Sequence, residues 1–137
     1  MKKPFDIYQR TFEFAVATIK LCRKISKEEN EYIVTKQLYR SSSSVGANTR
    51  EAKNAESKKD FTHKLAIAQK ECGESIYWFE IMNEVFTSNR REIDELIKES
   101  NEIHLILSTI IVNTKRGMVS GKRVEMGKYL NSKWSNE

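Results

Sequence analysis

The sequence predicts an all-α protein, folded as an antiparallel up-down-up-down four-helix bundle. Only one proline and five glycines interrupt the 137 residues, and 31% of the residues are charged, which suits long helices better than a turn-rich β fold. Apolar residues recur at spacings of three and four in four successive segments, so each segment has an apolar helical face. The segments are joined by a few polar residues, which forces neighbouring helices to run antiparallel.

The first predicted helix begins at about Asp6, a residue type that caps helix N-termini, and ends near Ser26. Its helical spacing defines one apolar stripe that we expect to face the core. The stripe consists of Phe5, Tyr8, Phe12, Ala15, Ile19 and Cys22. Cys22, like Cys72 on the third segment, is expected to be a small buried hydrophobic residue rather than part of a disulfide or a metal site.

The second predicted helix runs from about Glu31 to Lys53, with Val34, Leu38, Val45 and Ala52 on one side. Its serine-rich segment 41–48 consists of poor helix formers, and a loop at this point is the alternative. A continuous helix is favoured, because small side chains let two helix backbones approach closely and the apolar stripe stays in phase. Ser41 and Asn48 would then lie near the buried seam and need hydrogen-bond partners.

The third predicted helix begins after Ser57, which forms a capping-box pattern with Asp60, and reaches about Phe86. Its core stripe is Phe61, Leu65, Ala68, Cys72, Ile76, Phe79 and Phe86.

The fourth predicted helix runs from about Arg90 to Arg116 and is followed by Gly117, a residue type that often ends helices. Its stripe is Ile93, Leu96, Ile97, Ile103, Leu107, Ile110 and Ile111. We therefore expect one domain over residues 1–117, followed by a basic C-terminal tail over residues 118–137. The residues expected to be buried inside one subunit are Phe12, Ile19, Leu38, Val45, Leu65, Phe79, Leu107 and Ile111.

A second apolar face is predicted on the first and third helices, pointing away from the core stripe. Its members are Ile7, Phe14, Leu21, Ile67, Trp78, Ile81 and Val85. An exposed stripe that contains Trp and Phe is typical of an interaction surface, so we predict that the protein forms a homo-oligomer through these residues. The alternative is a monomer whose tail folds back over one stripe. Membrane-surface binding is less favoured, because acids and bases are mixed beside the stripes.

The net charge of +5 comes mostly from the C-terminus, where residues 115–137 hold six basic and two acidic side chains. Basic residues interleaved with Tyr129 and Trp134 are typical of nucleic-acid binding, although a solvated chain end explains them equally well. A smaller basic cluster opens the third helix. The candidate nucleic-acid-binding residues are Lys58, Lys59, Lys64, Lys115, Arg116, Lys122, Arg123, Lys128 and Lys133.

The second and third helices carry the elements QLYRS, SVGAN, EA and AESKKDF, followed by KL, KE and YW. In these elements the chain resembles the bacterial four-helix-bundle family encoded in intervening sequences of 23S ribosomal RNA genes. The resemblance implies a four-helix bundle assembled as a ring, a pentamer. It also implies kinship with the accessory protein of diversity-generating retroelements, which binds a reverse transcriptase and nucleic acid. It implies no catalytic residues, and nothing is carried over to the tail.

No catalytic or metal site is predicted. A di-metal bundle needs Glu-x-x-His on two helices, and the nearest match pairs Asp60 with His63, where Asp60 is better explained as a helix-start residue. His104 has no acidic residue three positions earlier, and no phosphate-binding or nucleophile motif is present. We expect a cytoplasmic protein without cofactor, small-molecule substrate or membrane span. The two remaining function classes are an RNA- or nucleoprotein-binding adaptor and a scaffold that binds only protein.

Overall fold

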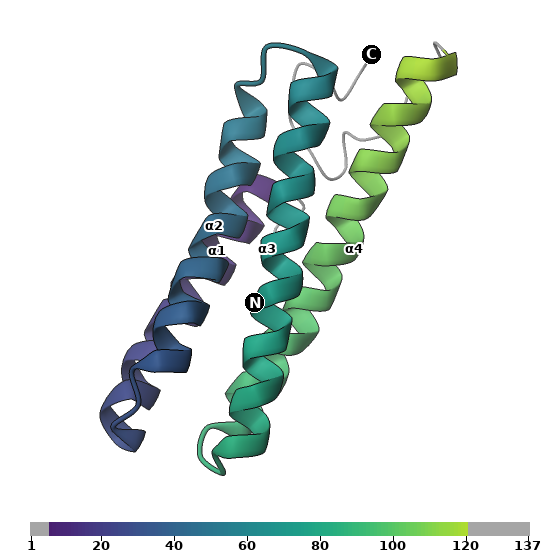
Figure 1. Cartoon of the computed structure of the whole chain (residues 1–137). Coiled ribbons are helices and arrows are strands. Elements are labelled where there is room, and N and C mark those ends of the chain that lie inside the picture. The colour runs from purple at the N-terminus through teal and green to yellow at the C-terminus, as the bar shows by residue number, and fades with distance from the viewer. Residues whose placement is uncertain (1–5, 121–137) are drawn as a thin grey trace.

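The structure, a computed structural model, describes residues 6–120. Four helices account for most of this range: α1 (Ile7–Glu29), α2 (Ile33–Lys53), α3 (Lys58–Val85) and α4 (Arg90–Ser120). The α1–α2 and α3–α4 joints lie at one end of the molecule and the α2–α3 joint lies at the other (Figure 1). This arrangement confirms the predicted all-α bundle with up-down-up-down topology.

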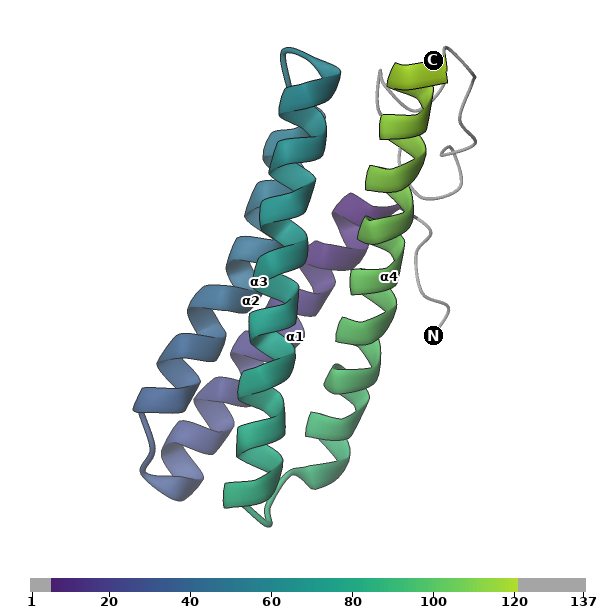
Figure 2. The ribbon, with the colours of Figure 1, turned by 45° about the vertical axis from the view of Figure 1, so that its right-hand side comes forward.

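Each helix packs on its neighbours in sequence, and α1 closes the bundle by contacting α4. The α1–α4 contact is the least extensive of the four. Because α1 begins part-way along the bundle, the end near the α2–α3 joint is formed by α2, α3 and α4 (Figure 2). The α1–α4 seam is therefore where the bundle depends most on individual contacts.

Side chains cap the helix starts much as the sequence predicts. Asp6 accepts a hydrogen bond from the Tyr8 backbone N–H at 2.8 Å, and Ser57 accepts one from the Asp60 N–H at 3.0 Å. The Asp60 carboxylate accepts from the Glu56 N–H, one residue earlier than a standard capping box would place it. The start of α2 differs from the prediction, because Glu31 lies outside the helix and accepts the N–H groups of its first turn.

The serine-rich segment of α2 is continuous helix, as predicted. The two serine hydroxyls of Ser41 and Ser75 lie 2.8 Å apart across the α2–α3 seam, and Asn48 donates to the Ser44 carbonyl at 2.9 Å. A Cβ atom at Gly46 would lie 3.3 Å from the Thr11 carbonyl oxygen on α1. Small residues thus let α2 approach two neighbours closely while its buried hydroxyls remain hydrogen-bonded.

The core side of α1 differs from the prediction. Ile7, Phe14 and Leu21, which we expected at a subunit interface, are buried inside the bundle, whereas the Phe12 side chain is 46% exposed and Ile19 is half-buried. Phe5 lies outside the described residues.

The physical reason is a four-and-three repeat that contains two threonines: Ile7, Thr11, Phe14, Thr18, Leu21 and Ile25. All six of these side chains are buried. Thr11 can occupy the core because its hydroxyl donates to the Ile7 carbonyl at 2.8 Å. A pattern that counts only apolar residues misses this face and selects its flank, of which Tyr8, Ala15 and Cys22 are buried as predicted.

The other core predictions are largely confirmed. Of the eight residues expected to be buried inside one subunit, five have no exposed surface, namely Leu38, Val45, Leu65, Phe79 and Leu107, and Ile111 is also buried. The Phe14 and Phe79 rings meet edge to face across the core, with centroids 6.4 Å apart. The helix α4 continues through Gly117 to Ser120, so Gly117 is not the predicted cap. Thr114 and Gly117 are buried, which extends the packed face of α4 beyond Ile111.

Candidate nucleic-acid and subunit interfaces

The structure brings the predicted basic residues of α3 and α4 to the same end of the bundle. Lys58, Lys59 and Lys64 lie on the first turns of α3, and Lys115 and Arg116 lie near the end of α4 (Figures 1 and 2). Acidic residues are mixed with them, and Lys64 pairs with Glu51 at 3.4 Å. This end is therefore only moderately basic. The predicted residues Lys122, Arg123, Lys128 and Lys133 lie outside the described part of the chain.

A second basic surface lies at the opposite end, between the end of α1 and the start of α2, and sequence reasoning missed it. A groove of about 970 Å³ opens there, which we call the basic groove. Its lining consists of Cys22, Arg23, Lys24, Ser26, Lys27, Tyr32, Thr35, Lys36, Tyr39 and Arg40. It contains five cations, two tyrosines and no acidic side chain. The sequence contains one signal for this groove. Arg23 and Lys27 are four residues apart on α1, Tyr32 and Lys36 are four residues apart at the start of α2, and each pair therefore lies on one helix face.

Carboxylates near the basic groove are engaged elsewhere. Glu31 accepts three backbone N–H groups at the start of α2, at 2.6–3.1 Å. Glu28 accepts from Asn89 at 2.8 Å and Glu29 accepts from Ser88 at 2.7 Å, so both are drawn toward the α3–α4 joint. These three carboxylates thus bond to the α2 cap and the α3–α4 joint rather than to the cations of the groove.

Cys22 in the groove lining is chemically protected. Its side chain is almost fully buried, and burial, assisted by the negative charge of Glu31, raises its pKa to about 12. A thiol with such a pKa is protonated at neutral pH and is a poor nucleophile or metal ligand. The groove is therefore suited to binding rather than to thiol chemistry.

An apolar groove of about 500 Å³ continues along the same α1–α2 seam. We call it the apolar groove. It is lined by Phe12, Ala15, Val16, Ile19, Ser43, Gly46, Ala47, Arg50, Glu51 and Asn54. The Arg50 guanidinium lies over the exposed Phe12 ring, 5.4 Å from its centroid. The part of the predicted first-helix stripe that is not in the core therefore forms a concave apolar surface.

The outer face of α3 matches the prediction in part. Ile67, Trp78 and Ile81 are half-buried, and the Val85 side chain is 64% exposed. Trp78 packs against the core and donates its indole N–H to Glu74 at 3.2 Å. Val85 is thus the residue of this face that remains most available for contact with another molecule.

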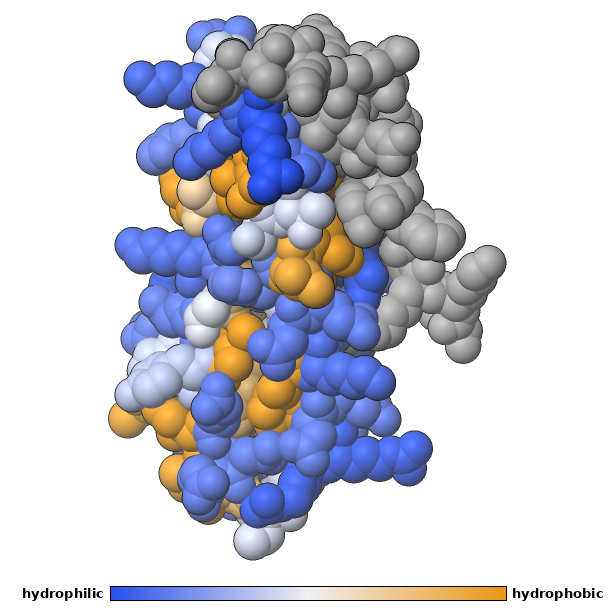
Figure 3. Space-filling view, turned by 90° about the vertical axis from the view of Figure 1, so that its right-hand side faces the viewer, coloured by the Kyte–Doolittle hydropathy of each residue, from blue (hydrophilic) through white to orange (hydrophobic). Residues whose placement is uncertain are grey.

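Exposed apolar side chains also occur on α4, where Leu105 and Val112 face outward. On this side of the molecule, hydrophilic side chains divide the apolar surface into separate patches (Figure 3). Scattered patches of this kind are normal on protein surfaces, so we assign no interface to them.

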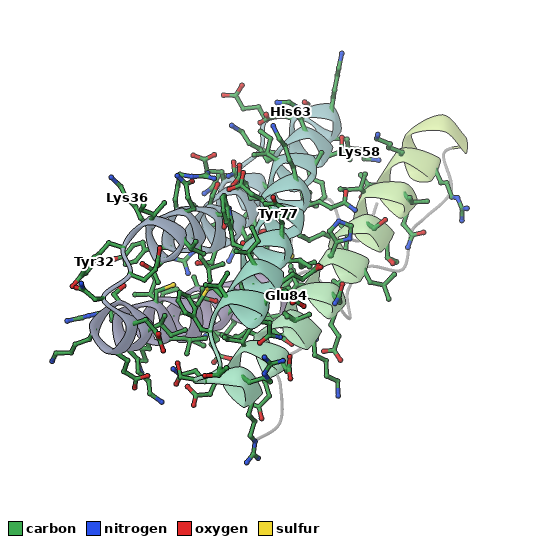
Figure 4. The ribbon with its side chains drawn as sticks, turned by 60° about the horizontal axis from the view of Figure 1, so that its bottom comes forward. Tyr32, Lys36, Lys58, His63, Tyr77 and Glu84 are labelled. Carbon is green, nitrogen blue, oxygen red and sulfur yellow. The ribbon has the colours of Figure 1, made fainter. Side chains whose placement is uncertain are left out.

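The histidines lie apart from each other. His63 is exposed near the start of α3 (Figure 4), and His104 is half-buried on α4. Within residues 6–120, no three His, Cys, Asp or Glu side chains converge on a position that could hold a metal ion. None of the helices described is both long and apolar enough to span a bilayer.

These features define a helical-bundle protein with concave apolar and basic surfaces. The model of the 23S rRNA-intervening sequence protein family matches residues 3–109, and the chain belongs to this family. The chain is also similar to a crystal structure of a protein of unknown function from the S23 ribosomal protein family of Bacteroides thetaiotaomicron. The two are 37% identical with a TM-score of 0.74, over 77% of this chain and 97% of that chain. No curated protein shows significant similarity to the chain.

The family assignment confirms the resemblance seen in the second and third helices. The matched region includes all of α1, α2 and α3 but ends within α4. Both grooves therefore lie inside the family region, and Lys115 and the residues after it lie outside it.

Proposed function

We propose that this protein is a non-enzymatic homo-oligomeric adaptor that binds RNA or a nucleoprotein associated with 23S rRNA intervening sequences in the cytoplasm. The observation that carries the proposal is the α1–α2 seam, on which an apolar groove and a basic groove follow one another. An apolar groove open to water favours contact with another protein surface, and a basic groove favours contact with phosphates.

The proposed subunit contact joins two different surfaces. Ile81 and Val85 on the outer face of α3 of one subunit meet Phe12 in the apolar groove of the next. Contacts between unlike surfaces are heterologous, and they close into rings when the rotation between subunits permits. A ring of five subunits is what the family resemblance implies.

The RNA-binding part of the proposal is supported by charge. The chain carries a net charge of +5, and basic residues gather in the basic groove, on the first turns of α3 and after residue 114. Several copies in a ring would add avidity to contacts that are weak in one subunit.

The test is a titration of a structured RNA at salt concentrations from about 50 to 200 mM. We expect salt-dependent binding, because counterions are released when cations neutralise phosphates. Deleting residues 118–137 removes four basic and two acidic side chains per subunit, and should weaken binding and lower its salt dependence. Equal affinities and slopes would show that the C-terminal cations do not contribute.

A second candidate function is an oligomeric scaffold that binds only protein. It is favoured by the acids mixed with Lys58, Lys59 and Lys64, because these acids reduce the positive potential at that end. Absence of RNA binding by the full-length protein at about 50 mM salt, where phosphate contacts are strong, would support this alternative.

A further inference from the structure

We propose that the basic groove is a binding site for a single-stranded RNA segment, with its cations on the phosphates and its two tyrosines stacked on bases. This inference rests on the proposed function, in which RNA is the ligand. It adds the position of the site and the form of the strand, neither of which follows from the basic residues singled out in the sequence.

The first support is the state of the five cations in the groove. Lys24 is held by Glu92 on α4 at 3.3 Å, and Arg40 is held by Glu71 and Glu74 on α3. Arg23, Lys27 and Lys36 form no ion pair within the part of the chain that the structure describes. Three cations from two helices therefore face one groove without a protein counterion, while the other two pair with acids of α3 and α4.

The second support is the pair of tyrosines. Tyr32 is 63% exposed and Tyr39 is 48% exposed, and among residues 6–120 neither ring stacks on another aromatic ring. They are seven residues apart, about two helical turns and roughly 10 Å along the axis, with Lys36 between them. Figure 4 shows Tyr32 and Lys36 next to each other at the start of α2. Aromatic rings and cations thus alternate along one side of the groove.

This alternation distinguishes the ligand. Proteins bind single strands through positively charged grooves whose aromatic side chains stack on successive bases. In an RNA duplex the bases are stacked on one another, and their faces are not accessible to a tyrosine ring. An acidic or phosphorylated peptide would use the cations but would leave two exposed rings without a role. A single strand uses both.

The experiment measures binding of a fluorescein-labelled oligouridine of about ten nucleotides, a typical length for such sites, to the full chain. An RNA duplex of the same length serves as the competing ligand. Tyr32→Ala with Tyr39→Ala removes the rings, and Tyr32→Phe with Tyr39→Phe keeps them. Lys27→Gln with Lys36→Gln removes two unpaired cations. Its matched control is Lys70→Gln with Lys98→Gln, which removes the same charge from exposed positions on α3 and α4.

We expect the single strand to bind more tightly than the duplex. Loss of each tyrosine ring should weaken binding roughly 5- to 150-fold, whereas the phenylalanine variant should bind like the unmodified protein. The slope of log affinity against log salt concentration is about 0.7 per phosphate contact on a single strand, so the Lys27/Lys36 variant should lower it by about 1.4. The control pair should leave this slope unchanged. Circular dichroism should show the same helix content in all variants.

Three outcomes would overturn the inference. If the protein binds oligouridine but the groove variants bind as well as the controls, RNA binding stands and this site is wrong. If the lysine variant loses affinity while the alanine variant does not, the groove recognises phosphate alone and the stacking role of the tyrosines is wrong. The same conclusion follows if the duplex binds as tightly as the single strand. If neither oligouridine nor structured RNA is bound, the proposed function fails together with the site.

Discussion

Arg10 and Glu99 form a two-bond ion pair that joins α1 to α4. The Arg10 Nε atom lies 2.9 Å from Glu99 Oε2 and its Nη2 atom lies 2.8 Å from Glu99 Oε1, and Glu102 also accepts from Nη2. The Arg10 and Glu99 side chains are only 13% and 14% exposed. The hydrogen bonds to Glu99 are the largest contribution that raises the pKa of Arg10, so its charge persists at all ordinary pH values. The pair closes the seam where the bundle has its least extensive contact.

Replacing Arg10 by Ala should therefore destabilise the bundle, because it removes two charge-assisted hydrogen bonds from the mostly buried Glu99 carboxylate. We expect a loss of about 3 kcal/mol in the free energy of unfolding, as for other ion pairs that are largely buried. The control is Lys24→Ala, which breaks a half-exposed pair with Glu92 across the same two helices and should cost about 1 kcal/mol or less. Urea unfolding measures both. Equal losses would show that the Arg10–Glu99 pair has no special role at the seam.

The orientation of α1 can be tested with two phenylalanines that are close in sequence. Phe14→Ala should cost about 3–5 kcal/mol, because it leaves a cavity beside Phe79. Phe12→Ala should cost less, and its effect should grow with protein concentration, because only another subunit can bury its ring. Urea unfolding at two protein concentrations distinguishes the two positions. If Phe12→Ala lowers the free energy of unfolding more than Phe14→Ala does, and equally at both protein concentrations, Phe12 faces the core as the sequence predicted.

Two helix glycines, Gly46 on α2 and Gly73 on α3, test how closely α1 and α2 approach. A Cβ atom added at Gly73 would have no neighbouring atom within 4 Å, so Gly73→Ala should stabilise the protein by up to about 1 kcal/mol through helix propensity alone. At Gly46 the added carbon would lie 3.3 Å from the Thr11 carbonyl oxygen, and the contact should offset that gain. Thermal unfolding should rank Gly73→Ala above Gly46→Ala. The reverse order would mean that the α1–α2 contact is looser than described.

The buried thiols make stability depend on pH above neutrality. Burial raises the pKa of Cys22 and Cys72 from 9.0 to about 12. The neutral thiols therefore contribute stability that is fully present below pH 9, the pKa in the unfolded chain, and is lost as the pH rises toward 12.

Cys22→Ala with Cys72→Ala should lower stability at neutral pH through lost packing, but should flatten its decline above pH 9 relative to the unmodified protein. Chemical unfolding across this range measures both curves, and the difference between them isolates the contribution of the two thiols. Parallel curves would show that the thiols are more accessible to water than their burial indicates.

The sequence predicts the helices and most of the core because the apolar residues of α2, α3 and α4 keep the helical phase on either side of the buried serines and threonines. It fails on α1, where Thr11 and Thr18 occupy core positions and their polar side chains hide the true repeat. The basic groove could not be recognised for a different reason. Arg23 and Lys27 on α1 and Lys36 on α2 belong to separate helices, and only the antiparallel packing of those helices brings them to one groove. Glu28, Glu29 and Glu31 between them also make the joint look neutral in the sequence.

The proposed subunit contact predicts different effects for three substitutions of exposed apolar residues. Phe12→Glu and Val85→Glu should each break the oligomer into smaller species, because each would bury an unpaired charge between subunits. Leu105→Glu, on the outer side of α4, should leave the assembly intact. All three residues are at least 46% exposed in the single chain, so helix content should be unchanged. Dissociation by Leu105→Glu alone would place the interface on α4 instead.

The mass of the unmodified protein in solution is the most direct test of the proposed homo-oligomer. Light scattering coupled to size exclusion at micromolar concentration should give about 80 kDa, five times the 16.0 kDa of one chain. A mass corresponding to two, three or four chains would change the number of subunits but keep the oligomer. A mass of 16.0 kDa at every concentration would contradict the account, because the apolar groove and the outer face of α3 would then remain in water without a partner.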